Sequence, residues 1–226
     1  MKNFILVTSL LFTVGTLHAC KGTAEKVNVE NKNELTIPAT QEEIQKDGLK
    51  TAYFASGCFW CVEAVFQSVK GVKDAVSGYS GGSEANPTYE QVSRGATSHA
   101  EAVKVIYDPS KVDFEALVKV FFGSHDPTTL NRQGPDRGPQ YRSIAFYKNE
   151  NEKQAIENYI ADLEGNNTYS APIVTEVKEF DEFWKAEDYH QEYENKHPEN
   201  PYVQSVSIPR LKRFQAKYPD LLKEGH

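Results

Sequence analysis

The sequence has few cysteines and no excess of basic residues. Only three of its 226 residues are cysteine, and its formal net charge is −7. An acidic chain offers no basic field for nucleic acid, so we expect no nucleic-acid partner. No spacing of His, Asp or Cys demands a metal, because Cys58 and Cys61 supply two ligands where a closed zinc site needs four. The composition therefore favours neither a nucleic-acid-binding protein nor a metalloprotein.

Long hydrophobic runs are also lacking. The apolar run at residues 4–14 is too short for a membrane-spanning helix, which needs about twenty apolar residues. Lys2 precedes it and Leu17-His18-Ala19-Cys20 follows, which is the pattern of a secretory signal. It resembles a bacterial lipoprotein signal, in which the cysteine becomes the lipidated first residue of the mature chain.

We therefore predict a signal peptide at residues 1–20, lipidation at Cys20, and a place in the bacterial cell envelope with membrane contact through the lipid only. Ordinary cleavage and an uncleaved anchor are the alternatives. Residues 21–46 are rich in Lys, Glu, Asn and Thr with few large apolar residues, which predicts a flexible, solvated tether. Residues 47–226 are enough for one hydrophobic core and contain no internal repeat, so we expect a single catalytic domain there.

Short strands and amphipathic helices alternate along this domain. Apolar patterns predict strands at residues 50–56, 72–77, 102–107, 143–147 and 173–178, and helices over residues 62–69, 114–121 and 156–163. Such a mixture, with polar loops between, predicts an α+β two-layer sandwich with extensive coil. The loop at residues 126–140, with three prolines and two glycines, is long enough to be functional.

The most informative motif is Gly57-Cys58-Phe59-Trp60-Cys61-Val62-Glu63. Gly57 allows a sharp turn between the first strand and the helix, so Cys58 is expected where free backbone N–H groups and the helix dipole favour a thiolate. Two large aromatics beside it supply an apolar pocket. This is the layout of a redox nucleophile, although free cysteines are also common as small buried core residues.

A carboxylate directly precedes the predicted strand at residues 102–107. Period-2 geometry places Glu101 on the same face as Val103, Val105 and Tyr107, which aims it into apolar surroundings. Desolvation would raise its pKa, as a general acid requires near neutral pH. The alternative is a frayed strand end in water, since carboxylates are rarely buried.

The cysteine motif and four further stretches resemble the A-type methionine sulfoxide reductases over about residues 50–217. The further stretches follow in the family's order: Gly78-Tyr79-Ser80-Gly81-Gly82 with Asn86-Pro87-Thr88-Tyr89; His99-Ala100-Glu101-Ala102-Val103; His125-Asp126-Pro127 through Asn131 to Ser143; and Ala186-Glu187-Asp188-Tyr189-His190-Gln191. The resemblance implies a ferredoxin-like mixed sheet with helices and coil. It also implies reduction of the S epimer of methionine sulfoxide, free or in oxidised proteins and peptides, by a monomer.

Catalytic roles follow from the resemblance. Cys58 would attack the sulfoxide sulfur, and Glu101 would protonate or hydrogen-bond its oxygen. Tyr89 and Tyr141 would help to hold that oxygen. On periodicity alone, such tyrosines are more often core or surface residues, because the chain has 12 of them.

Substrate-binding roles come from the same resemblance. Phe59 and Trp60 would enclose the methyl group, and Asp136 would accept a hydrogen bond from the substrate backbone. His125 and His190 also lie in family-like stretches, but a lone histidine beside tyrosine is usually a satisfied structural residue.

The oxidised nucleophile needs a second thiol. A sulfenic acid at Cys58 would condense with Cys61 to a disulfide, since residues 214–226 contain no cysteine of the kind that serves many family members. Helical neighbours at i and i+3 have Cβ atoms about 5 to 6 Å apart, and a disulfide needs roughly 3.8 Å, so the first turn would have to loosen. An external thiol is the alternative. A thioredoxin-like reductant would restore both thiols, and no other cofactor is expected.

Two rival functions remain. A thioredoxin-like disulfide exchanger would also place Cys-x-x-Cys at a helix start, but it predicts a small or proline-containing spacer where this chain has Phe59-Trp60. A non-enzymatic envelope lipoprotein would have no need for Cys58 and no reason to turn Glu101 toward the core.

Overall fold

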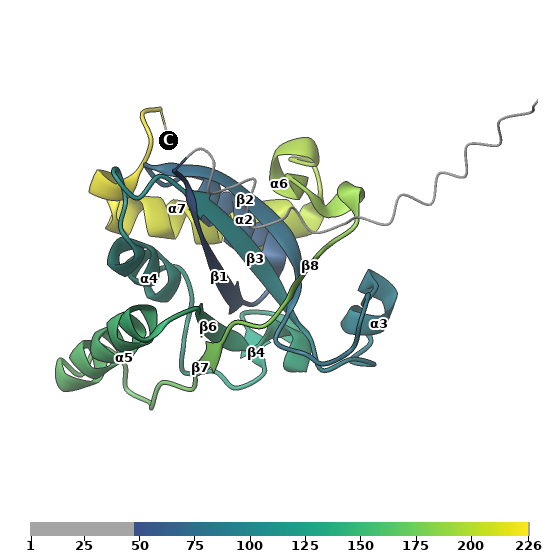
Figure 1. Cartoon of the computed structure of the whole chain (residues 1–226). Coiled ribbons are helices and arrows are strands. Elements are labelled where there is room, and N and C mark those ends of the chain that lie inside the picture. The colour runs from purple at the N-terminus through teal and green to yellow at the C-terminus, as the bar shows by residue number, and fades with distance from the viewer. Residues whose placement is uncertain (1–47, 226) are drawn as a thin grey trace, which may run out of the picture. The chain divides into compact units, whose positions relative to one another are not determined.

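The computed structural model describes residues 48–225 (Figure 1). The predicted signal at residues 1–20, the tether at residues 21–46 and Cys20 lie outside the described residues. In the part of the chain that is described, no helix is both long and apolar enough to cross a membrane. Within that same part, no group of three or more His, Cys, Asp or Glu side chains is arranged to hold a metal ion.

A six-stranded mixed sheet forms the centre of the described region, in the order β7-β6-β1-β3-β2-β8 (Figure 1). All pairs are antiparallel except β6 with β7. The strands are β1 (Lys50–Ser56), β2 (Val72–Ser80), β3 (Ala100–Tyr107), β6 (Ser143–Tyr147), β7 (Glu176–Glu179) and β8 (Phe183–Lys185).

Four of these strands and two helices make the ferredoxin-like unit. The helices are α2 (Phe59–Gln67) and α4 (Phe114–Gly123), and the chain order β1-α2-β2-β3-α4-β6 gives the spatial order β6-β1-β3-β2. This β-α-β-β-α-β arrangement confirms the predicted fold class. Both helices cover one face of the sheet, where Phe54 of β1 stacks on Phe66 of α2 and Phe121 of α4, each with ring centroids 5.1 Å apart.

The other helices are α3 (Tyr89–Ser93), α5 (Glu150–Gly165), α6 (Tyr193–Lys196) and α7 (Ile208–Lys217), with a π-helical turn at Val203–Ser207 before α7. The sheet face opposite α2 and α4 is covered largely by coil. There, Tyr53 of β1 stacks on Phe180 with ring centroids 3.7 Å apart. The two-layer arrangement with extensive coil is therefore present.

The predicted elements differ from the structure mainly at their ends. β2 and β3 are longer than predicted, and the strand predicted at residues 173–178 is found at Glu176–Glu179. Inside the loop at residues 126–140, β4 (Arg132–Gln133) pairs with β5 (Asp136–Arg137). β8, α3 and α6 were not predicted, because elements of three to five residues are too short to show a period.

Candidate active site

The turn between β1 and α2 places the first cysteine. Gly57 has φ +89°, and a Cβ on it would lie 2.6 Å from the Cβ of Gln133, so only glycine fits. Cys58 is the N-cap of α2 with φ −52° and ψ 123°, and its carbonyl accepts from Val62 N at 3.3 Å. The predicted position at a helix start is therefore correct. Cys58 lies just outside the helix, so the helical i, i+3 spacing assumed for the pair does not constrain it.

A cavity of about 330 Å³ opens beside Cys58. It brings together every predicted site residue in the described part of the chain except Cys61. Its lining is Cys58, Phe59, Trp60, Tyr89, Glu101, Asp136, Tyr141, Asn200 and Tyr202. Five separate stretches of sequence thus converge on one space.

Glu101 is the buried acid of this cavity. Its side chain belongs to β3, is 2% exposed, and accepts a hydrogen bond from Phe59 N at 3.0 Å through Oε2. Burial raises the pKa of Glu101 to about 8, with the charges of Asp136 and Cys61 adding to the effect and the Phe59 N–H opposing it. The carboxyl group therefore holds a proton at neutral pH. The strand period predicted this burial, and the alternative of a solvated strand end is wrong.

The two cysteines are free thiols, and both are buried. Burial raises the pKa of Cys58 well above its ordinary value, and the neighbouring Cys61 and Glu101 act in the same direction. The expectation that the helix start favours a Cys58 thiolate is therefore wrong for the resting site, because desolvation outweighs the helix dipole. A hydrogen bond with Cys58, aided by the charge of Arg210, lowers the pKa of Cys61 to about 6.

Tyr202 is a site residue that sequence reasoning missed. Its hydroxyl donates to Asp136 Oδ2 at 2.6 Å and lies 3.9 Å from Cys61 Sγ. Asp136 therefore already has one partner, and its second oxygen can accept from another donor in the cavity. The nearby Asn200 also lines the cavity. Asn200 directly precedes a short helical segment, and Tyr202 lies at the start of that segment, next to the π-helical turn Val203–Ser207. No local sequence pattern marks either residue as part of the site.

His190 supports the aromatic wall from behind. Its Nδ1 accepts a hydrogen bond from Trp60 Nε1 at 3.1 Å, and its ring packs 4.9 Å from Phe59 and 4.3 Å from Tyr89 between centroids. Trp60 also stacks on Tyr193, with ring centroids 3.7 Å apart and an interplanar angle of 8°. Burial lowers the pKa of His190 to about 4, so the ring is neutral. His190 thus orients Trp60 and does not line the cavity.

His125 lies away from the cavity and has both ring nitrogens satisfied. Nδ1 is 2.7 Å from Phe121 O, and Nε2 is 2.8 Å from Ser143 Oγ. Burial lowers the pKa of His125 to about 3. It is a structural residue that ties α4 to β6.

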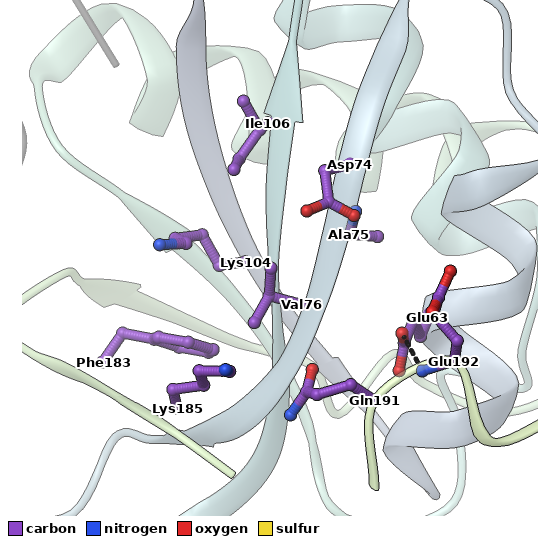
Figure 2. A pocket seen from close by; sticks show the side chains of 10 residues that line it. All are labelled: Glu63, Asp74, Ala75, Val76, Lys104, Ile106, Phe183, Lys185, Gln191 and Glu192. Carbon is purple, nitrogen blue, oxygen red and sulfur yellow. Dashed lines mark hydrogen bonds between the residues drawn. The ribbon is translucent and has the colours of Figure 1, made fainter. Parts of the chain in front are cut away.

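A larger cavity of about 560 Å³ lies on the coil-covered face of the sheet (Figure 2). Its lining includes Lys104, Asp74 and Glu63. Neither Cys58 nor Cys61 lines it, and no other predicted site residue does. Glu63 lies on α2, accepts from Ser77 Oγ at 2.5 Å and accepts from Glu192 N at 2.7 Å, the bond drawn in Figure 2. Burial raises the pKa of Glu63 to about 7. Glu63 thus connects α2 by a hydrogen bond to Glu192, the residue directly before α6.

A protonated carboxyl group and a cysteine thiol facing one aromatic-walled cavity, on a ferredoxin-like sheet, define a thiol-dependent oxidoreductase. The family model described as peptide methionine sulfoxide reductase matches residues 50–221. The chain belongs to this family, and it is an enzyme that reduces methionine sulfoxide. The resemblance inferred from the five motifs is confirmed.

Individual relatives agree with this assignment. The chain is 48% identical over 177 residues to peptide methionine sulfoxide reductase MsrA 2 of Synechocystis sp., covering 78% of this chain and 83% of the relative. Methionine sulfoxide reductase A of Corynebacterium diphtheriae is similar in structure, with a TM-score of 0.60 and 36% identity over 67% of this chain and 76% of that chain. Reduced Mxr1 of Saccharomyces cerevisiae is similar in structure, with a TM-score of 0.62 and 32% identity over 67% of this chain and 87% of that chain.

Proposed function

We propose that this chain reduces the S epimer of methionine sulfoxide by attack of Cys58 on the sulfur while Glu101 protonates the oxygen. A sulfoxide sulfur is a poor electrophile until its oxygen accepts a proton or strong hydrogen bonds. The observation that carries the proposal is the pair formed by the buried Glu101, with its pKa raised to about 8, and the Cys58 thiol in one cavity. The carboxyl proton is thus available at neutral pH, where an exposed carboxylate would have lost it.

Two phenols support the oxygen in this proposal. Tyr89 and Tyr141 line the cavity, and burial raises the pKa of Tyr89 to about 12 and that of Tyr141 above its ordinary value. Both hydroxyls therefore keep their protons and can donate to the developing oxygen charge. The same charge would be unstable in an apolar site without such donors.

The remaining cavity walls select the methionine side chain. Phe59 and Trp60 enclose the methyl group, and Asp136 accepts a backbone N–H of the substrate through the oxygen that Tyr202 leaves free. These contacts cover only the oxidised side chain and a little main chain. We therefore expect the enzyme to act on many oxidised proteins and peptides and on the free amino acid.

The oxygen leaves as water when Cys61 closes a disulfide with Cys58. Attack on sulfur leaves a Cys58 sulfenic acid and releases methionine, and the Cys61 thiolate then displaces hydroxide, which takes a proton. Because Cys58 is an N-cap residue with non-helical backbone angles, the disulfide does not require a full helical turn to unwind. A thioredoxin-like dithiol then restores both thiols, which makes the cycle catalytic.

The separated epimers test this proposal. We expect the full-length chain with a thiol reductant to consume the S sulfoxide of a methionine sulfoxide peptide and to leave the R sulfoxide unchanged, with Cys58→Ser inactive on both. Ser68→Ala, which lies at the far end of α2 outside the cavity, is the matched control and should retain activity. Equal consumption of both epimers, or an active Cys58→Ser variant, would refute the proposed chemistry.

We further propose that the chain is a lipoprotein of the bacterial envelope, lipidated at Cys20 after removal of the residues that precede Cys20, with residues 47–226 as the catalytic domain. The support is the sequence of the first 20 residues and the tether composition of residues 21–46. Expression of the full chain in a bacterium tests it. The native chain should sediment with membranes and Cys20→Ala should not; a native chain found only in the soluble fraction would overturn the anchor.

A further inference from the structure

Two walls of the substrate cavity come from separate elements of the chain. In the proposed function, Tyr89 donates to the sulfoxide oxygen and Trp60 packs on the methyl group, so Tyr89 forms an oxygen subsite and Trp60 forms a methyl subsite. Trp60 lies in α2, and Tyr89 is the first residue of α3, a helix of 5 residues. So short a helix is not stable by itself, so the place of Tyr89 depends on contacts from other elements.

Glu187 holds the start of α3 from outside the cavity, whose lining does not include it. Its Oε1 accepts a hydrogen bond from Tyr89 N at 2.9 Å, and its Oε2 accepts one from the Tyr79 hydroxyl at 2.8 Å. Tyr79 is a buried residue of β2 and pairs with Glu101 of β3 in the sheet. The Glu187 carboxylate therefore connects the backbone of Tyr89 to the strand that pairs with the buried acid.

The same carboxylate acts on the ring of His190. His190 Nδ1 accepts from Trp60 Nε1 at 3.1 Å, so the proton of the neutral ring is on Nε2. Among residues 48–225, no group accepts a hydrogen bond from this buried Nε2, and Glu187 Oε2 lies 4.0 Å from it. Burial lowers the pKa of His190, and the negative charge of Glu187 acts in the opposite direction. That charge stabilises the tautomer with the proton on Nε2, which is the tautomer that can accept the Trp60 N–H.

We propose that Glu187 is a positioning residue that holds the oxygen subsite through Tyr89 N and the methyl subsite through the His190 tautomer, and that it thereby restricts the substrate to S-methyl sulfoxides. This inference rests on the proposed function, which assigns the two subsites. The two effects depend on different properties of one side chain. The first needs a hydrogen-bond acceptor for Tyr89 N, and the second needs a negative charge beside His190.

Glutamine separates the two effects, because Glu187→Gln keeps an acceptor and loses the charge. Its amide oxygen can accept from Tyr89 N, and its amide nitrogen can donate to the Tyr79 hydroxyl. The rate constant for methionine formation in single turnovers without reductant should therefore stay within about twofold of wild type. Glu187→Ala loses both effects, and its rate constant should fall about tenfold or more, because the Tyr89 hydroxyl is no longer held for the oxygen. A wild-type rate constant in Glu187→Ala would contradict the proposal.

The S-alkyl group of the substrate reports on the methyl subsite. The S epimers of methionine sulfoxide and ethionine sulfoxide differ there by one methylene, which is worth about tenfold or more in the second-order rate constant when the pocket is tight. This methyl-to-ethyl ratio should fall at least about threefold in both Glu187→Gln and Glu187→Ala, since Trp60 is held less firmly. The wild-type ratio in both variants would overturn the proposal.

Asp188→Ala is the matched control. It removes a carboxylate from the next residue, which is exposed and accepts from Lys185 Nζ at 2.7 Å. It should keep both the rate constant and the methyl-to-ethyl ratio of wild type. Equal effects of Asp188→Ala and Glu187→Ala would contradict the proposal.

A second substitution at His190 tests the path to the methyl subsite. His190→Ala removes the acceptor for the Trp60 N–H and should lower the methyl-to-ethyl ratio by itself. Adding Glu187→Gln to this variant should lower the ratio no further, because the charge then has no ring to act on. Additive losses would mean that Glu187 does not act through His190, and the proposed path would be wrong.

The outcome is separable from the proposed function. Methionine formed in these single turnovers by the wild-type enzyme, and lost in Cys58→Ser, reports only on the reaction at Cys58. Its absence in wild type would refute the proposed function. Normal methionine formation by wild type, with the wild-type methyl-to-ethyl ratio in both Glu187 variants, would refute the role of Glu187 alone.

Discussion

Replacing Glu101 with glutamine should abolish sulfoxide reduction and, at alkaline pH, stabilise the protein. The carboxyl group is 2% exposed, and burial raises its pKa from 4.5 to about 8. At pH values between 4.5 and about 8, the native state therefore keeps a proton on Glu101 that the unfolded chain has lost. The free energy of unfolding falls as the pH rises through this window. The pKa difference is about 3.5, and each pKa unit corresponds to about 1.36 kcal/mol. The unfolding free energy lost by ionising Glu101 is therefore at most about 5 kcal/mol. Glutamine carries no charge and avoids this loss, and its amide oxygen can still accept from Phe59 N.

Urea unfolding at pH 5 and pH 9 measures this effect. The unfolding free energy of Glu101→Gln relative to wild type should rise between the two pH values by several kcal/mol, up to about 5 kcal/mol. The contributions of other groups cancel in that difference. Glu157→Gln, an exposed substitution on α5, is the matched control and should show almost no change. Parallel pH profiles for wild type and Glu101→Gln would show that Glu101 is ionised in the native protein, and the acid role would fail.

Three further substitutions have defined outcomes. Cys61→Ser should form one methionine per chain and then stop with a sulfenic acid at Cys58; continued turnover with thioredoxin would show that another thiol resolves Cys58. Tyr202→Phe removes the donor to Asp136 and should lower kcat/KM for a sulfoxide peptide about tenfold, and an unchanged value would exclude this hydrogen bond from substrate binding. In wild type, the buried Glu63 should lower the free energy of unfolding by up to about 3 kcal/mol as the pH rises from 4.5 to about 7, and Glu63→Gln should remove this loss in urea unfolding. The same pH dependence in both proteins would mean that the Glu63 carboxyl is ionised throughout this range.

The sheet and the acid could be predicted because their signals are local and periodic. Alternation along β3 placed Glu101 on the buried face, and the i, i+3, i+4 spacing located α2 and α4. The aromatics of the cavity had no such signal. Only the resemblance to a family singled out Tyr89 and Tyr141 from the other tyrosines.

What could not be predicted depends on long-range contacts. Tyr202 and Asn200 reach the cavity from more than 140 positions beyond Cys58, so no spacing relates them to this cysteine. The ionisation of Cys58 was predicted in the wrong direction for the same reason. A helix dipole can be inferred from local sequence, but the desolvation that outweighs it comes from residues folded over the thiol.

The most direct test of the whole account is the product of one turnover in the absence of reductant. The full-length chain is mixed with the S sulfoxide of a methionine peptide and quenched, and the methionine and the cysteine-containing peptides are quantified by mass spectrometry. The account predicts one methionine per chain, together with a disulfide between Cys58 and Cys61. Methionine formed while Cys58 remains a free thiol would contradict it.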